Sequence, residues 1–247
     1  MIKYHTWTNI SVTPRKAMTD SLEQRYQTLC QRLDRAAEAA DRPRPRLLAV
    51  SKKHSAAAIR RLYALGQREF GESYWQEAEA KMAELQDLDI VWHFIGPLQS
   101  NKTRPVAEHF HWVQSVEREK IARRLSEQRP SQLPPLQVCI QVNIDRESSK
   151  SGAAPEQVLP LARAIIDLPG LSLAGLMCLP ARREDPAAQR EAFHRLAQLR
   201  AELASDGLGC PILSMGMSDD LEAAIAEGSD LVRVGTALFG PRQKTVT

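Results

Sequence analysis

Short apolar runs alternate along this chain with longer stretches in which apolar residues recur every three or four positions. The short runs do not alternate with polar residues, which is typical of strands buried on both faces of a parallel sheet. The longer stretches have the spacing of amphipathic helices. The pattern predicts strands at residues 47–51, 69–71, 90–95, 112–116, 136–144, 171–179, 211–214 and 231–234. It predicts helices from residue 19 or 21 to 41 and at 55–66, 75–85, 102–109, 119–128, 155–167, 186–204 and 219–227.

About eight strands that alternate with helices fit an α/β fold, a single (β/α)8 TIM barrel with an extra N-terminal helix. The chain length of 247 residues suits such a barrel. An open doubly wound sheet is the alternative, although no G-x-G-x-x-G motif follows the first strand. We assign residues 19–247 to the barrel. Residues 1–18 are polar and unpatterned, and we expect a disordered leader in which Met18 is an alternative initiator.

Composition excludes several classes of function. The net charge of +3 is small and spread along the chain, which argues against nucleic-acid binding. The four cysteines are far apart and no His/Cys/Asp cluster has metal-ligand spacing, so we expect reduced thiols and no metal. No apolar run is long enough to cross a membrane and no signal peptide is recognisable, so we expect a cytoplasmic protein that binds no membrane.

A lysine, Lys52, directly follows the first predicted strand. The carboxyl ends of the strands of a barrel converge on one face, and ligands bind there. A partly desolvated lysine at such a place can form a Schiff base with an aldehyde. The plainer interpretation is a solvated lysine at the end of a strand.

The last two strands end in turns rich in Gly, Ser and Thr. Barrels often hold phosphate in these two loops, through backbone N–H groups and hydroxyls. Asp219 and Asp220 would repel a phosphate, so we place it near Gly235 and Thr236 with Ser218 at its side. The alternative is that the serine caps a helix and the glycine only forms a turn.

Arg233 lies inside the apolar strand 231–234. A buried positive charge needs a ligand or a partner, so the alternative is a carboxylate within the barrel or escape of the side chain to solvent. A guanidinium beside a pyridine nitrogen would keep that nitrogen unprotonated. Together with Lys52 and a phosphate site, the arginine fits one ligand, pyridoxal 5'-phosphate (PLP).

The same residues belong to motifs shared with a known family. These motifs lie between about residue 22 and Arg242 and are LAVSK at 48–52, FGE at 70–72, HFIGPLQSNK at 93–102, SKSG at 149–152, GLM at 175–177, SMGMSDD at 214–220 and RVGTALFG at 233–240. The sequence resembles the PLP homeostasis proteins, whose single barrel is similar to the N-terminal domain of alanine racemases. The resemblance implies the barrel of type III PLP proteins without the C-terminal β-domain.

The resemblance also implies a site. PLP would form an internal aldimine on Lys52, Arg233 would face the pyridine nitrogen, and the phosphate would lie around Ser218, Gly235 and Thr236. The other candidate cofactor contacts come from the remaining strand ends and their loops, namely Ser73, His93, Asn143, Met177, Ser214, Gly216 and Met217, with Lys150 as a secondary amine for PLP. A hydrogen-bonded structural histidine is the plainer interpretation of His93.

Two positions depart from the family pattern. The family commonly has Asn where this chain has Ser73, and the lost amide would cost about 1 kcal/mol if neither the hydroxyl nor water replaces it. The family often continues Thr-Lys-Pro after the Schiff-base lysine, whereas this chain has Lys53, His54 and Ser55. A role for the family's second lysine therefore does not carry over directly.

Three functions remain open from the sequence. The first, implied by the resemblance, is a carrier that takes part in intracellular PLP (vitamin B6) homeostasis without turnover, with no catalytic residue and with PLP-requiring apo-enzymes as transient partners. The second is a PLP-dependent amino-acid racemase, but racemisation needs a second acid/base, and we see no second domain to supply a tyrosine. The third is a phosphate-sugar barrel enzyme. One barrel suffices for the cofactor site, so we expect a monomer.

Overall fold

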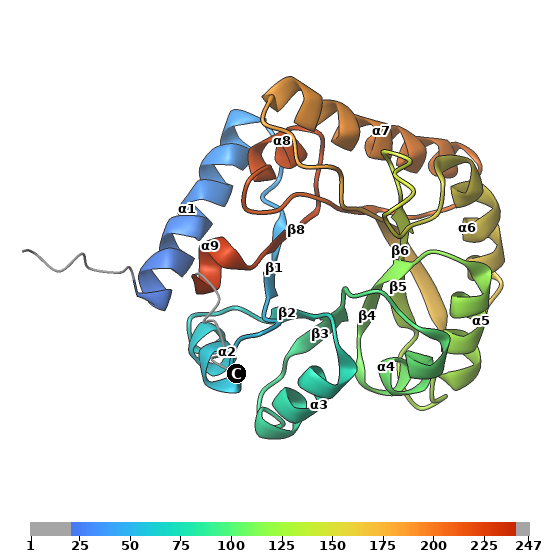
Figure 1. Cartoon of the computed structure of the whole chain (residues 1–247), viewed down its shortest axis with the longest axis horizontal. Coiled ribbons are helices and arrows are strands. Elements are labelled where there is room, and N and C mark those ends of the chain that lie inside the picture. The colour runs from blue at the N-terminus through green and yellow to red at the C-terminus, as the bar shows by residue number, and fades with distance from the viewer. Residues whose placement is uncertain (1–20, 241–247) are drawn as a thin grey trace, which may run out of the picture.

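The computed structural model describes residues 21–240, which form one closed barrel of eight parallel strands in the order β1 to β8 (Figure 1). The open sheet is therefore wrong and the (β/α)8 barrel is confirmed. The strands are β1 (Arg46–Val50), β2 (Glu69–Glu72), β3 (Val91–Phe94), β4 (Trp112–Val116), β5 (Leu136–Val142), β6 (Leu171–Cys178), β7 (Ile212–Ser214) and β8 (Leu231–Val234).

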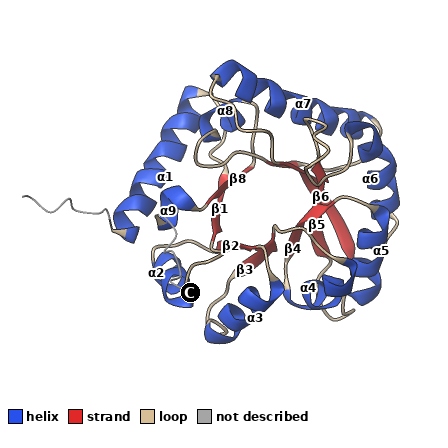
Figure 2. Cartoon of the chain, viewed as in Figure 1, coloured by secondary structure: helices blue, strands red, loops and turns tan. Residues whose placement is uncertain are grey.

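Helices surround the strands as an outer ring (Figure 2). They are α1 (Leu22–Ala39), α2 (Ala56–Ala64), α3 (Trp75–Glu84), α4 (Thr103–His109), α5 (Glu119–Gln128), α6 (Val158–Ile166), α7 (Pro186–Ser205), α8 (Leu221–Ala226) and α9 (Thr236–Phe239). Short 3-10 helices at Ser100–Lys102 and Pro155–Gln157 precede α4 and α6. No helix in the described range 21–240 is long and apolar enough to cross a membrane.

The first helix, α1, is the predicted addition before the barrel. The Ser21 hydroxyl accepts a hydrogen bond from the N–H of Gln24 at 3.2 Å, and the Gln24 side chain accepts one from the N–H of Ser21 at 2.8 Å. This reciprocal capping box fixes the start of the helix. The alternative cap, Thr19, and the expected leader 1–18 lie outside the described residues.

One continuous apolar core fills the space between strands and helices, and it includes fully buried Leu33, Phe70, Phe193 and Ile165. The barrel closes where β1 pairs with β8, in a register that sets Leu48 beside Arg233. Parallel pairing around the ring brings all carboxyl strand ends to one face. Residues that are far apart in the sequence, above all those after β1 and β8, therefore become neighbours.

The start of α8 differs from the prediction. The chain was expected to become helical at residue 219, but α8 begins at Leu221. The Asp220 carboxylate accepts a hydrogen bond from the N–H of Met217, which closes a turn before the helix. The loop after β7 therefore stays non-helical through the predicted phosphate-binding residue Ser218.

Strands β6 and β7 approach closely at Gly175, where an added Cβ would lie 1.9 Å from the carbonyl oxygen of Ile212. We expect Gly175→Ala to lower the free energy of unfolding by about 3 kcal/mol, because the clash is with backbone that cannot rotate away. Urea denaturation would measure the change. Gly209→Ala is the matched control, since nothing lies within 4 Å of its Cβ position. Equal stability of the two variants would contradict the close approach.

Candidate ligand-binding site

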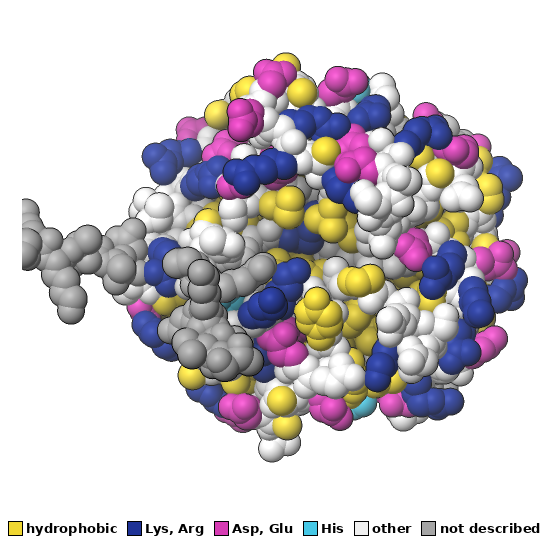
Figure 3. All heavy atoms as spheres, in the orientation of Figure 1, with side chains coloured by type: hydrophobic (Ala, Val, Ile, Leu, Met, Phe, Trp, Pro, Cys, Tyr) yellow, Lys and Arg dark blue, Asp and Glu magenta, His cyan; other side chains and the backbone are white. Residues whose placement is uncertain are grey.

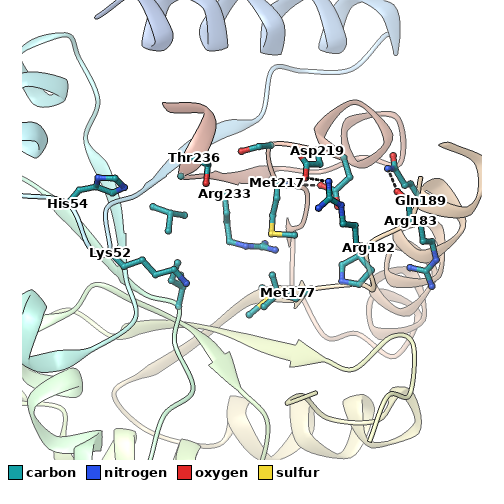
Figure 4. Close-up of a pocket in the computed structure, with 17 residues that line it drawn as sticks. Lys52, His54, Met177, Arg182, Arg183, Gln189, Met217, Asp219, Arg233 and Thr236 are labelled. Atoms are coloured by element: carbon teal, nitrogen blue, oxygen red, sulfur yellow. Dashed lines mark hydrogen bonds and ion pairs between the residues drawn. The ribbon is translucent and has the colours of Figure 1, made fainter. Parts of the chain in front are cut away.

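A cavity of about 410 Å³ opens at the carboxyl ends of the strands. Hydrophobic side chains gather at the centre of the face shown in Figure 3, with Lys and Arg side chains beside them. Seven of the predicted cofactor residues line the cavity: Lys52, Met177, Met217, Ser218, Arg233, Gly235 and Thr236. In Figure 4 the side chains of Lys52 and Arg233 extend into the same space, with Met177 and Met217 beside them.

Charged side chains of β2 and α3 hold the backbone on either side of Lys52. Lys81 on α3 donates from Nζ to the carbonyl oxygen of Ser51 at 2.8 Å, and the Ser51 hydroxyl donates to Glu72 at 2.6 Å. The N–H of Lys53 donates to the Glu77 carboxylate. The next residue after Lys52 is thereby fixed in the left-handed region, with φ of 65°.

These supports form a compact ion-pair cluster. Nζ of Lys81 lies 2.7 Å from Glu72 and 2.6 Å from Glu77, and Glu72 is fully buried. Burial raises the pKa of Glu72, although the charge and hydrogen bond of Lys81 oppose the shift. A buried charge with its partner removed is strongly destabilising, so each member of the cluster holds the others in place.

Arg233 is 4% exposed and stays within the barrel. Its Nη1 donates to the Ser214 hydroxyl at 2.8 Å and its Nη2 donates to the Cys178 carbonyl at 2.7 Å. Burial lowers the pKa of Arg233, but a guanidinium keeps its proton at any ordinary pH. No carboxylate among residues 21–240 forms an ion pair with it, so neither alternative from the sequence, pairing or escape to solvent, holds.

The loop after β7 is shaped by a glycine. Gly216 has φ of +92°, and a Cβ there would lie 2.6 Å from Cβ of Ala224. Its carbonyl oxygen accepts the N–H of Arg233, and Arg32 donates to the carbonyl oxygen of Ser218 at 2.8 Å. These contacts hold the loop against β8 and α1, which leaves the Ser218 residue beside Gly235 in the cavity wall.

Each of the two aspartates that would repel a phosphate has a partner, a cation for Asp219 and a backbone N–H for Asp220. Asp219 lies 3.4 Å from Arg182, and the Asp220 carboxylate binds the N–H of Met217. The dashed lines at Arg182 in Figure 4 mark the first of these pairs. The cavity wall holds four cationic side chains, Lys52, Arg182, Arg183 and Arg233, and two carboxylates, Asp219 and Asp220.

The outer wall of the cavity comes from the loop after β6, which the sequence did not single out. Asp145, with a side chain 7% exposed, accepts hydrogen bonds from Arg183 at 2.6 Å, from Arg195 at 2.9 Å and from the N–H of Ala181 at 2.7 Å. Burial works to raise the pKa of Asp145, but these hydrogen bonds hold it below its ordinary value. The loop after β5 thus anchors the loop that carries Leu179, Pro180, Arg182 and Arg183 into the cavity wall.

Six predicted site residues do not line the cavity, and three of them organise loops. Asn143 binds the backbone N–H and carbonyl of Glu147, which folds the loop after β5. Lys150 lies 2.7 Å from the Glu147 carboxylate. Gly216 forms the turn described above. Contact of these residues with a ligand stays a prediction.

The other three are buried. The carbonyl oxygen of Ser73 would lie 2.2 Å from a Cβ on Gly96, so the loops after β2 and β3 touch here. Ser214 receives the Arg233 hydrogen bond. His93 is fully buried, and its Nδ1 is hydrogen-bonded to Nε2 of the Gln114 side chain at 2.9 Å. It is hydrogen-bonded within the barrel interior, and contact of these three residues with a ligand also stays a prediction.

Several wall residues were missed from the sequence. His54 lines the cavity and stacks on Phe239 of α9 with ring centroids 4.4 Å apart. Gln189 of α7 donates to the Arg183 carbonyl at 2.7 Å. These residues lie on loops or helices rather than at strand ends, and only the position of a histidine after Lys52 could have suggested one of them. Among the described residues no group of His, Cys, Asp and Glu could hold a metal ion.

This fold and site define a class of protein. The family model "Alanine racemase, N-terminal domain" matches residues 25–243. The structure of PipY from Synechococcus elongatus with PLP bound superposes with a TM-score of 0.79 at 37% sequence identity, over 89% of this chain and 100% of that one.

Curated relatives give the narrower group. The pyridoxal phosphate homeostasis protein of Pseudomonas aeruginosa is 60% identical, over 85% of this chain and 91% of the relative. The protein of the same name from Vibrio cholerae is 50% identical, over 90% of this chain and 97% of the relative. The chain belongs to the alanine racemase N-terminal domain family and, within it, to the pyridoxal phosphate homeostasis proteins.

The Asp145 contacts predict a pH-dependent stability difference. The Asp145 pKa is lower in the folded chain than in the unfolded chain, so its stabilisation is present above about pH 4 and is lost as the pH falls through the folded-state value. We expect Asp145→Asn to lower the free energy of unfolding by about 2 kcal/mol at neutral pH. Urea denaturation across pH should show the gap closing in acid. Asp167→Asn, at an exposed helix end, is the control. A gap that persists unchanged in acid would contradict the ionised clamp.

The thiols beside the site should be inert. Burial raises the pKa of Cys139 and of Cys178 to about 12, and Cys210 is also buried. Because the thiolate is the reactive form, we expect Ellman's reagent to modify half-buried Cys30 in the native protein and the other three only after unfolding. Cys30→Ser should remove the native reaction. A native reaction of more than one thiol would be incompatible with this burial.

Proposed function

We propose that this chain binds PLP in the cavity at the carboxyl ends of the strands, covalently on Lys52, and takes part in intracellular PLP homeostasis. One observation carries the proposal. The same cavity is lined by the amine of Lys52 and by Arg233, a buried arginine that forms no ion pair with a described carboxylate. The relative PipY, at 37% identity, has a structure described with PLP bound. The curated relatives carry homeostasis in their names.

The chemistry of the cavity fits the cofactor. Nζ of Lys52 can condense with the aldehyde carbon of PLP to form a Schiff base, with loss of water. The hydroxyls of Ser218 and Thr236 and the backbone of Gly235 suit a phosphate. The thiols, with their raised pKa, do not compete with the lysine for the aldehyde.

We propose binding and delivery rather than turnover. PLP supplies an aldehyde and a ring that can act as an electron sink. The guanidinium of Arg233 favours an unprotonated ring nitrogen, which weakens that sink. The described tyrosines, Tyr26, Tyr63 and Tyr74, do not line the cavity, so none of them is placed as a second base.

We propose that the protein acts in the cytoplasm as a monomer and that PLP-requiring apo-enzymes receive its cofactor transiently. Lys52, Arg233 and the Gly235–Thr236 turn all line one cavity, which supports a site built within a single barrel. The four free thiols, three of them buried, suit a reducing compartment. Sedimentation of the purified protein tests the monomer, and transfer of PLP to an apo-enzyme across a dialysis barrier compared with direct mixing tests the need for contact.

The first experiment is an absorbance spectrum of the protein incubated with PLP and purified. We expect a visible band in the wild type that borohydride fixes on the Lys52 peptide, and we expect Lys52→Ala to lose it. Lys150→Ala is the matched control, because Lys150 is an amine near the cavity that is engaged with Glu147. A featureless wild-type spectrum would favour the phosphate-sugar barrel enzyme. A band that survives in Lys52→Ala and disappears in Lys150→Ala would move the anchor.

The racemase alternative has its own measurement. Incubation of the PLP-loaded protein with L-alanine or L-serine in deuterated water should leave the α-proton in place, because none of the described tyrosines lines the cavity as a second base. Proton NMR detects the exchange. Exchange that is abolished by Lys52→Ala would establish turnover and overturn the carrier proposal.

A further inference from the structure

A single file of polar side chains crosses the interior of the barrel and ends at Arg233. The guanidinium Nη1 lies 2.8 Å from Oγ of Ser214, and that hydroxyl lies 2.6 Å from Oε1 of Gln114. Nε2 of Gln114 lies 2.9 Å from Nδ1 of His93. Nε2 of His93 lies 3.2 Å from the Glu69 carboxylate. The members come from β8, β7, β4, β3 and β2, so the file spans the ring rather than following its edge.

The donors in this file all point the same way. A guanidinium can only donate, so the Ser214 oxygen accepts from Arg233 and its proton must go to Oε1 of Gln114. The amide N–H2 of Gln114 then faces His93 and donates to Nδ1. His93 must therefore carry its proton on Nε2, next to Glu69. One cation at the cavity fixes the orientation of every group behind it.

Little freedom remains for any member to reorient. Ser214, Gln114 and His93 are all fully buried. The His93 ring stacks on Trp112 with centroids 5.2 Å apart and an interplanar angle of 10°. A buried polar group that loses its hydrogen-bond partner destabilises the fold more than an exposed one does. A rearrangement of one member would therefore force the other members to change their hydrogen bonds.

The charged groups around His93 come from several strands. Glu69 on β2 faces Nε2, Arg46 on β1 binds Glu69 at 3.3 Å, and His111 precedes β4. Burial lowers the pKa of His93, against the opposing effect of the Glu69 carboxylate. Burial also lowers the pKa of His111. His93 is therefore neutral at physiological pH, which leaves Nδ1 free of a proton so that it can accept the hydrogen bond from Gln114.

We propose that Gln114 and His93 are positioning residues for Arg233: through Ser214 they set the orientation of the guanidinium that faces the ring nitrogen of the bound cofactor. The inference rests on the proposed function for its ligand, but the file itself is a property of the ligand-free chain. If Gln114 cannot accept from Ser214, the hydroxyl loses its acceptor and Arg233 loses its fixed partner. The cofactor would then be held less tightly and in an altered electrostatic environment.

The test replaces Gln114 by methionine, which keeps the length of the side chain and removes both hydrogen bonds. We expect Gln114→Met to weaken PLP binding about tenfold, as for the loss of about 1.4 kcal/mol, and to shift the absorption maximum of bound PLP. Gln141→Met is the matched control, because Gln141 is a buried glutamine of β5 that binds the Ser151 carbonyl instead. Unchanged affinity and spectrum in folded Gln114→Met would overturn the inference.

A ligand-free measurement separates this inference from the proposed function. In 15N NMR of the protein without PLP, we expect His93 as the Nε2–H tautomer, and we expect the guanidinium signals of Arg233 to move in Gln114→Met and to stay in Gln141→Met. The opposite tautomer, or Arg233 signals that do not respond, would refute the file. If wild-type protein binds no PLP, the proposed function fails while this NMR result still decides the inference. Ser214→Ala, which breaks the next link, replaces Gln114→Met if that variant does not fold.

Discussion

The site depends on a full positive charge held inside a barrel. Arg233 stands in the middle of β8 with no carboxylate beside it among the described residues, and it is stabilised by a hydroxyl and a carbonyl. A cation in such a place has a large desolvation cost, which neutral acceptors offset only in part. An electron-rich nitrogen brought by a ligand would complete its hydrogen bonding. The apolar strands around it fix the charge in position in the cavity wall.

The lysine across the cavity is positioned by the opposite means. Lys52 lies on a loop, and its neighbours are held by a cluster of two carboxylates and Lys81 beneath the sheet edge. Ion pairing holds that cluster together, whereas Arg233 has no carboxylate partner among the described residues. The same kinds of charged side chain are therefore an ion-paired support on α3 and a cation without a counter-charge in the cavity wall on β8. Burial alone does not distinguish the two roles, but the presence or absence of a buried counter-charge does.

The sequence predicted the barrel and the residues at its strand ends, because short apolar runs and the residues that follow them are local signals. Lys52, Ser218, Arg233 and Gly235 all lie in the cavity wall as expected. Contacts between distant segments were not predictable. The residues near Asp145 in the sequence do not indicate that it anchors a loop through Arg183. The sequence likewise does not indicate that Gln114, a residue of a strand, accepts a hydrogen bond from Ser214. His93 was singled out by its motif, yet its position in the interior depends on register, which a single sequence does not reveal.

The pairing of β1 with β8 has a consequence for the order of events during synthesis. Lys52 leaves the ribosome early, whereas Arg233, Gly235 and Thr236 emerge only after seven strands have been made. A partial chain has the amine but neither the cation nor the turn beside it. The part of the cavity wall that both ends of the barrel contribute is therefore complete only after the ring has closed. Once bound, the ligand would connect the first and last strands and oppose the opening of the barrel at the place where it closed last.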